Sequence, residues 1–102
     1  MSAEIDPLIH QTTRLRLMAI LNHLEPADWI DFNMLKNELS LTDGNLGAQL
    51  IKLEEAKYLR IKKGFLGRRP RTQVQATQRG RTAFTSHCET LRKIIDNNHV
   101  NE

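Results

Sequence analysis

The sequence holds few of the residues used for disulfides, metal sites or membrane insertion. Cys88 is the only cysteine among 102 residues, so an internal disulfide is impossible, and the four histidines lack zinc-like spacing. The longest apolar runs have four to five residues, far short of the roughly 20 that span a bilayer. The first residues show no secretory signal character. We therefore expect a cytoplasmic protein without a metal, a cofactor or a membrane partner.

Motifs for catalysis are also missing. The chain shows no Ser/His/Asp order, no pair of acids in a cleft pattern, no phosphate loop and no glycine-rich nucleotide motif. His87, Cys88 and Glu89 are adjacent, and adjacent residues on a helix point in different directions, so they cannot all bind one metal without help from another chain. Cys88 lies in an apolar pattern, which favours a small core residue over a redox sensor. The sequence therefore predicts a protein that is not an enzyme.

The composition is that of an ordinary globular domain. Hydrophobic residues make up 39% and charged residues 26% of the chain. A chain of this length can bury a core without cross-links, and no internal repeat or low-complexity segment suggests a second unit. We expect residues 1–102 to form one domain.

Charge is strongly segregated along the chain. Residues 1–55 contain four Lys or Arg and nine Asp or Glu, whereas residues 57–81 contain nine Lys or Arg and no acid. A protein that needs charge only for solubility usually mixes the two signs. The basic block therefore indicates a polyanionic partner, and the alternative is a solvated basic face.

The first part of the chain suits an arm followed by a helix. Residues 1–11 are interpreted as an N-terminal arm, with room for one helical turn at Asp6–His10. Thr12 or Thr13 can cap the helix, which ends before Pro26. Its expected apolar face consists of Leu15, Met18, Ala19 and Leu21.

The next two helices are joined by a short break. Asp31 is a plausible cap for a helix that runs to about Leu39. After residues 40–42, Thr42 or Asp43 can cap a third helix over about 43–56. Apolar residues repeat at helical spacing in both helices: Leu35 and Leu39, then Leu46, Leu50 and Leu53. So tight a connection predicts a helix-turn-helix.

Alternation replaces helical periodicity after Ala56. Residues 58–63 and 72–76 suit the two strands of a hairpin, and residues 64–71 suit a long basic tip. Thr77 can cap a last helix over 78–98, in which apolar residues recur at steps of four, three and four: Phe84, Cys88, Leu91 and Ile95. The predicted fold is mainly α with a small β-hairpin. It is a winged helix-turn-helix with a three-helix core, a two-stranded wing and a long C-terminal helix.

Several strings of the sequence look like those of a known group of proteins. They are IHQTTRLRLM (residues 9–18), LTDGNLGAQL (41–50) with KLEEAKYL (52–59), and GRRPRT (67–72) with TQRGR (77–81). These strings resemble small winged-helix DNA-binding transcriptional regulators of the MarR and ArsR type. The resemblance covers roughly residues 5–90 and implies a DNA-binding dimer that regulates transcription. Lys57 departs from the pattern, because relatives often place a glycine at this helix exit.

Candidate base contacts fall on the third helix. Asn45, Gln49 and Lys52 are spaced by four and three residues, so they share one face of the helix, away from the leucines. Asn and Gln pair bidentately with adenine, and Lys donates to guanine or phosphate, which predicts reading of the major groove. Thr42 is expected to contact a phosphate or only to cap the helix. Asp43 is expected to cap rather than to contact DNA.

Candidate backbone contacts fall on the hairpin. Narrow minor grooves attract arginine, and Pro70 limits the freedom of the tip and so lowers the entropic cost of ordering it. The predicted contacts are Lys62, Lys63, Arg68, Arg69 and Arg71. Arg79 and Arg81 stand near the start of the last helix, where ordinary surface charge is the alternative.

The last helix predicts a homodimer. Phe84, Cys88, Leu91 and Ile95 form an apolar seam that is too long for one small core, so its end would otherwise meet water. The arm is a second expected contribution. Two other functions remain open: a winged-helix adaptor for protein assembly, and an RNA-binding module. The basic block and the Asn45 face argue against the adaptor, and few aromatics are present to stack on RNA bases.

Overall fold

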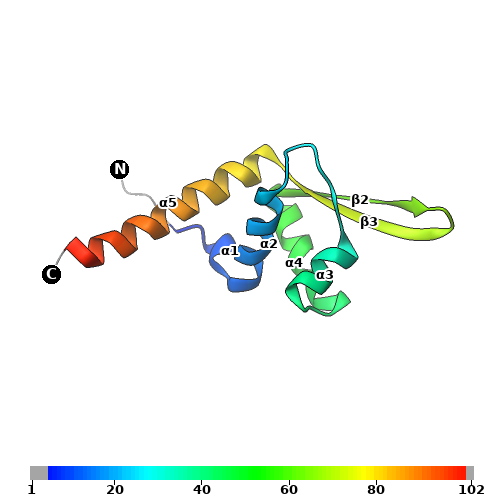
Figure 1. Ribbon diagram of the computed structural model, residues 1–102, viewed down its shortest axis with the longest axis horizontal. Helices are drawn as coiled ribbons and strands as arrows, with labels where there is room; N and C mark the ends of the chain where they lie inside the picture. Colours follow the sequence, from blue (N-terminus) through cyan, green and yellow to red (C-terminus); the bar gives the residue numbers. More distant parts are fainter. Residues whose placement is uncertain (1–4, 101–102) are drawn as a thin grey trace.

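The polypeptide folds into a helical body with a projecting hairpin and a long last helix (Figure 1). Residues 5–100 of the computed structural model are described, with side chains through residue 97. The helices are α1 (Pro7–His10), α2 (Thr12–His23), α3 (Phe32–Leu39), α4 (Asp43–Glu55) and α5 (Gln78–Val100), and the strands are β1 (Ile30–Asp31), β2 (Leu59–Leu66) and β3 (Arg69–Ala76). The hairpin and α5 extend to opposite ends of a molecule that measures 60 × 25 × 21 Å. The predicted winged helix-turn-helix is confirmed.

The sheet has three strands, one more than predicted. β1 pairs with β3 through Ile30 opposite Val74 and Asp31 opposite Gln73, so β3 lies between β1 and β2. A strand of two residues is too short to show an alternating pattern, and periodicity could not predict it. β1 ties the base of the hairpin to α3, which begins at the next residue.

The hairpin turn is much shorter than the predicted loop over residues 64–71. β2 continues to Leu66 and β3 begins at Arg69, so the turn consists of Gly67 and Arg68. Gly67 has φ 64°, a left-handed conformation that glycine adopts readily at the first position of a two-residue hairpin turn. The tip is therefore a narrow ribbon end and not an open loop.

Pro70 lies inside β3, although proline usually interrupts strands. The pair that closes a two-residue hairpin, here Leu66 and Arg69, is hydrogen-bonded, so the next pair, Phe65 and Pro70, is not. The Pro70 nitrogen then faces the edge of β3, beyond the reach of β1. A proline at such an open edge removes no ladder bond.

The predicted N-terminal arm is part of the core. Asp6 caps α1, because its Oδ1 accepts the N–H groups of Leu8 at 2.9 Å and Ile9 at 3.2 Å. Ile9 is 0% exposed and packs inside its own domain. It is therefore not available to a partner, in contrast to the expected role of the arm in dimerisation. Residues 1–4 of the arm lie outside the described residues.

α2 begins and packs differently from the prediction. Gln11, and not Thr12 or Thr13, is the N-cap, since its Oε1 accepts the Arg14 N–H at 2.9 Å. Ala19 is exposed. The buried face of α2 consists of Leu17, Met18 and Leu21.

The core gathers one apolar face from each of α1 to α4 together with the base of the hairpin. All five leucines predicted for α3 and α4 are buried. Burial of each such side chain stabilises the fold by roughly 1.5–3 kcal/mol. The buried apolar residues are Ile9, Leu17, Met18, Leu21, Leu35, Leu39, Leu46, Leu50, Leu53, Leu59, Val74 and Ala76. This core leaves the opposite face of α4 to solvent.

The exit from α4 is a left-handed turn in which Lys57 takes the place of the usual glycine. Lys57 has φ 65°. Its N–H donates to the Glu54 carbonyl at 2.9 Å, and the Tyr58 N–H donates to the Leu53 carbonyl at 2.9 Å. These two bonds form a Schellman motif. The helix cap therefore forms although Lys57 is not a glycine. The lysine pays a steric cost for its left-handed conformation.

The start of α5 packs tightly against this exit. Thr77 caps α5 as predicted, since its Oγ1 accepts the Gly80 N–H at 3.0 Å. The Thr77 N–H also donates to the Tyr58 carbonyl at 3.0 Å. A Cβ atom on Gly80 would lie 2.0 Å from the Tyr58 carbonyl oxygen, so only glycine allows this approach.

α5 presents a different inner face from the predicted seam. His87 and Thr90 are 1% and 4% exposed, whereas Cys88 is only half-buried and is not a core residue. Further along, Ile94 is 42% and Ile95 is 65% exposed. Across residues 5–100, no helix is long and apolar enough to cross a membrane.

Candidate nucleic-acid interface

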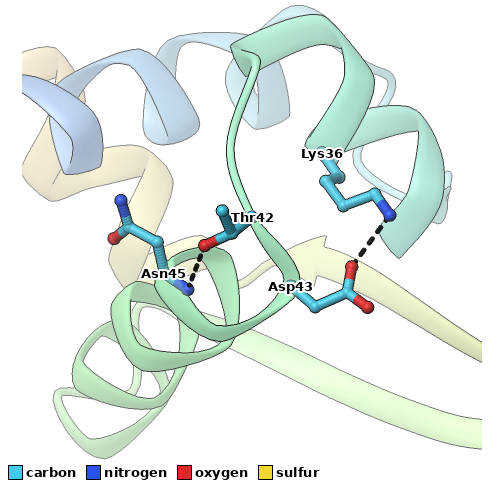
Figure 2. A network of polar contacts seen from close by, with 4 residues as sticks. All are labelled: Lys36, Thr42, Asp43 and Asn45. Carbon is cyan, nitrogen blue, oxygen red and sulfur yellow. Dashed lines mark hydrogen bonds and ion pairs between the residues drawn. The ribbon is translucent and has the colours of Figure 1, made fainter.

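The turn between α3 and α4 sets the start of the exposed helix. Ser40 has φ 55°, and the Leu41 N–H donates to the Lys36 carbonyl at 3.0 Å, which closes α3. Thr42 then caps α4, because its Oγ1 accepts the Asn45 N–H at 3.1 Å (Figure 2). The predicted helix-turn-helix and its Thr42 cap are confirmed.

Asp43 pairs with α3 and does not cap α4. Its Oδ1 lies 2.8 Å from the Lys36 Nζ (Figure 2), and its side chain is 74% exposed. A pair so exposed contributes at most about 1 kcal/mol. Lys36 nevertheless offsets the negative charge of Asp43, the one acid in the first turn of α4. At this end of the helix, the dipole and the unpaired N–H groups favour an anion.

Asn45, Gln49 and Lys52 lie on the outer side of α4, as their spacing predicts. Asn45 and Lys52 are exposed, whereas Gln49 is half-buried. The Gln49 Nε2 donates to the Asn45 Oδ1 at 3.3 Å. The three side chains therefore belong to one surface, and a hydrogen bond joins Asn45 to Gln49.

Gln49 is also held by Arg14 of α2. The Arg14 Nη1 donates to the Gln49 Oε1 at 2.7 Å, and its Nε donates to the Leu8 carbonyl at 2.6 Å. The guanidinium thus sets the Gln49 oxygen toward α2 and the Gln49 nitrogen toward Asn45. The Asn45 amide nitrogen has no hydrogen-bond partner among residues 5–97 and can donate to a ligand.

The basic residues of the wing divide between two faces, because side chains alternate along a strand. Lys63 faces the helices, since it lines one cleft with Gly47 and Ile51 of α4. The register places the others on the opposite face: Arg60 and Lys62 on β2, and Arg69 and Arg71 on β3. Arg68 lies in the turn. The wing is therefore charged on both sides and at its end.

Two of the predicted wing contacts are held by residues of the body. The Lys62 Nζ lies 4.2 Å from the centroid of the Trp29 ring, a cation–π contact. The Arg71 Nε donates to the Asp31 Oδ1 at 3.1 Å. Asp31 stands at the N-cap position of α3, as predicted, but its carboxylate makes no cap hydrogen bond.

The remaining basic side chains of the outer hairpin are unpaired. Within residues 5–97, Lys63, Arg68 and Arg69 make no ion pair or side-chain hydrogen bond, and all three are exposed. Arg60 is also exposed and makes no ion pair or side-chain hydrogen bond within these residues. It was not among the predicted contacts, although it lies on the same face of β2 as Lys62. These cations need no intramolecular bond to be broken before they meet an anion.

Arg81 is a structural residue. Its Nη2 donates to the carbonyls of Leu24 at 2.7 Å and Leu21 at 3.2 Å. It thereby binds carbonyl groups at the C-terminal end of α2, where a cation also complements the helix dipole. Because its guanidinium is engaged in this way, we no longer consider Arg81 a candidate DNA contact.

A polar network joins the start of the chain to the base of the wing and to α5. The Tyr58 hydroxyl donates to the Asp6 Oδ2 at 2.6 Å, and the Asp6 N–H donates to the His87 Nδ1 at 3.2 Å. Burial, and then the hydrogen bond to Asp6, raise the pKa of Tyr58 to about 12. Burial, and then the neighbouring His10, lower the pKa of His87. The network fixes α5 relative to the body.

The sequence matches the family described as winged helix DNA-binding domain over residues 13–95. The chain belongs to this family. A further relative is an uncharacterized protein of Methanocaldococcus jannaschii, which is 34% identical over 90 residues, or 88% of this chain and 95% of that protein.

Solved structures show the same winged-helix architecture. A transcriptional regulator homologue from Pyrococcus horikoshii OT3 has a TM-score of 0.80 and 27% identity, with 90% of this chain and 88% of that chain covered. NadR, solved in complex with 4-hydroxyphenylacetate, has a TM-score of 0.66 and 21% identity, with 89% and 64% covered. The second likeness supports the fold alone. The predicted resemblance to winged-helix regulators is confirmed.

Proposed function

We propose that this winged-helix protein is a homodimeric, MarR-like transcriptional regulator that binds double-stranded DNA sequence-specifically and has no catalytic role. α4 enters the major groove, and the wing contacts the backbone and the minor groove. The main support is the exposed polar face of α4 beside a basic hairpin, in a chain of a DNA-binding family. A cytoplasmic location is part of the same proposal.

Base reading is assigned to the outer face of α4. Asn45 donates to an acceptor on a base edge, because its oxygen already accepts from Gln49. Lys52, further along the same face, donates to guanine or phosphate. Thr42 and the first N–H groups of α4 contact a phosphate and so set the depth of the helix in the groove.

The wing supplies contacts that position the protein without reading sequence. Lys63, Arg68 and Arg69 neutralise phosphates or enter the minor groove, since they are exposed and unpaired within the described residues. Lys62 and Arg71 add positive charge from fixed positions on the wing, where Trp29 and Asp31 hold them.

Residues 1–102 act as one domain that pairs through α5. Phe84 packs on the core, Cys88 and Leu91 are half-buried, and Ile95 is 65% exposed. A second copy of α5 against this side would bury all four residues. A two-fold axis would then place the two α4 helices on half-sites about 34–36 Å apart.

Selection from a pool of random duplexes tests this proposal. We expect enrichment of a pseudo-palindromic site whose half-sites are one helical turn apart. Retention of duplexes without any enriched sequence would contradict sequence-specific reading. If no duplex is retained even at low salt, the result would contradict DNA binding and favour the alternative of a protein-interaction adaptor.

A further inference from the structure

The end of the wing is apolar as well as basic. Phe65 is 73% and Leu66 is 64% exposed, and both precede the two-residue turn. The hairpin projects far from the helical body (Figure 1). β1 pairs only with Gln73 and Val74 near the base of β3, so no third strand of the described chain reaches the tip.

The two apolar side chains lie on opposite faces of the ribbon. Phe65 is paired with Pro70 on the face that continues from Lys63, whereas Leu66 is paired with Arg69 on the other face. Each face therefore combines an apolar group with a neighbouring cation. Arg68 adds a third cation in the turn itself.

We propose that Phe65 and Leu66 form an apolar wedge that enters the minor groove, partly unstacks one base step and bends the duplex. This inference rests on the proposed function and adds a deformation of the DNA to it. Apolar side chains inserted between base steps kink DNA by about 20–90° toward the major groove.

The shape and the charge of the tip both favour this occupant. The two strands lie about 4.8 Å apart and the minor groove is about 6 Å wide, so a ribbon with side chains on both faces enters only if the groove opens. Unstacked bases then offer apolar surface to Phe65 and Leu66. The phosphates of the groove walls complement Lys63, Arg68 and Arg69, and residues 57–81 contain no acid.

The shape of bound DNA tests the proposal directly. The probe is a duplex of about 30 base pairs with a central TA step, which kinks easily, and with donor and acceptor dyes at its ends. The test variant is Phe65→Ser, Leu66→Ser, and the matched control is Met34→Ser, since Met34 is 62% exposed on α3. Protein is added at low salt until the duplex is saturated.

We expect the wild-type protein and the Met34→Ser control to shorten the end-to-end distance of the duplex. The double variant should bind with an unchanged salt slope, because it keeps its phosphate contacts, but should leave the duplex straight. A wild-type complex with straight DNA would overturn the wedge while leaving DNA binding intact. A double variant that still bends DNA fully would overturn the wedge and assign the bend to another part of the protein. A double variant whose main change is a lower sedimentation coefficient of the protein would also overturn it, because Phe65 and Leu66 would then contact a second copy. Failure of the wild type to bind any duplex would overturn the proposed function, and the wedge with it.

Discussion

The Arg14 Nη1 donates to the Gln49 Oε1 at 2.7 Å, and this bond links α2 to the outer face of α4. The same guanidinium holds the Leu8 carbonyl, so α1 takes part as well. In the proposed complex, the orientation of the Gln49 amide is therefore set before DNA arrives. Arg14 acts as a positioning residue for base reading and need not touch a base.

A double-mutant cycle tests the coupling of Arg14 to Gln49. Gln49→Ala and Asn45→Ala should each lower the preference for the selected site by roughly 1–3 kcal/mol, with little change for unrelated duplex. Arg14→Ala should lower the same preference, and its effect should not add to that of Gln49→Ala, with a coupling of about 0.5–3 kcal/mol. The measured quantity is the ratio of the two affinities.

Arg14→Lys is the matched control for charge. This variant keeps the positive charge but loses the guanidinium, which donates to two acceptors at once. It should therefore lower the preference for the selected site as much as Arg14→Ala does. Additive effects of Arg14→Ala and Gln49→Ala would mean that Arg14 acts separately from the base-reading face.

The unpaired cations of the wing should dominate the salt dependence of binding. The variant Arg68→Ala, Arg69→Ala should flatten the plot of log affinity against log salt by about 0.9 for each phosphate that the wing no longer neutralises, or roughly two units. Titrations of an unrelated duplex at several salt concentrations measure the slope.

Arg71 provides the comparison within the wing. Because Asp31 already binds it, Arg71→Ala should change the slope less than removal of either unpaired arginine. An unchanged slope in the double variant would remove the wing tip from the interface. A larger effect of Arg71 would show that its ion pair opens on binding.

Dimerisation should depend on the exposed end of α5. Ile95→Asp places a charge on a side chain that is 65% exposed, so it should not disturb the fold of one protomer but should oppose burial between two. Sedimentation at micromolar concentration should show a dimer for the wild type and a monomer for Ile95→Asp. A wild-type monomer would contradict the proposed dimer, and a variant that stays dimeric would move the interface elsewhere.

Lys57→Gly should stabilise the fold. A left-handed conformation costs a residue with a side chain roughly 1–2 kcal/mol, and glycine avoids this cost. Part of the gain is offset by the greater freedom of glycine in the unfolded chain, so we expect an increase of up to about 1 kcal/mol in the free energy of unfolding by denaturant. Lys52→Gly, in the regular part of α4, should destabilise instead. Equal effects at both positions would contradict a strained cap.

Stability should fall in mildly acidic solution because of His87. Its folded-state pKa is lowered from 6.5 by burial and by His10, so the unfolded chain binds more protons as the pH drops through 6.5. The stabilisation is thus complete above this pH and is lost as the pH falls toward the folded-state pKa. His87→Asn keeps an acceptor near the Nδ1 position but does not titrate. Its free energy of unfolding should change less between about pH 7.5 and 5.5; an equal change would assign the effect to other groups.

Local signals predicted most of the fold. The break at residues 40–42 with Thr42 as cap, the leucines of α3 and α4, and the Thr77 cap all follow from short-range patterns. The strand boundaries were wrong at the tip because Gly64 and Pro70 are typical turn residues. Pairing along the ribbon, and an open edge for the Pro70 nitrogen, override that local preference.

Long-range contacts could not be predicted from such patterns. Arg14 and Gln49 are 35 positions apart and Asp31 and Arg71 are 40 apart, and periodicity says nothing about such pairs. The same limit explains Cys88 and His87. A helical repeat places both near the apolar side of α5, and only packing against α1 and Asp6 makes His87 the buried one.

The affinity of the wild-type protein for an unrelated duplex, measured at low and at moderate salt, shows whether α4 and the wing bind DNA. We predict measurable binding at about 50 mM salt and a fall in affinity of roughly 10³–10⁵ by about 200 mM if six to ten phosphates are contacted. Binding that is absent at low salt, or that does not respond to salt, would contradict a DNA-binding role for α4 and the wing.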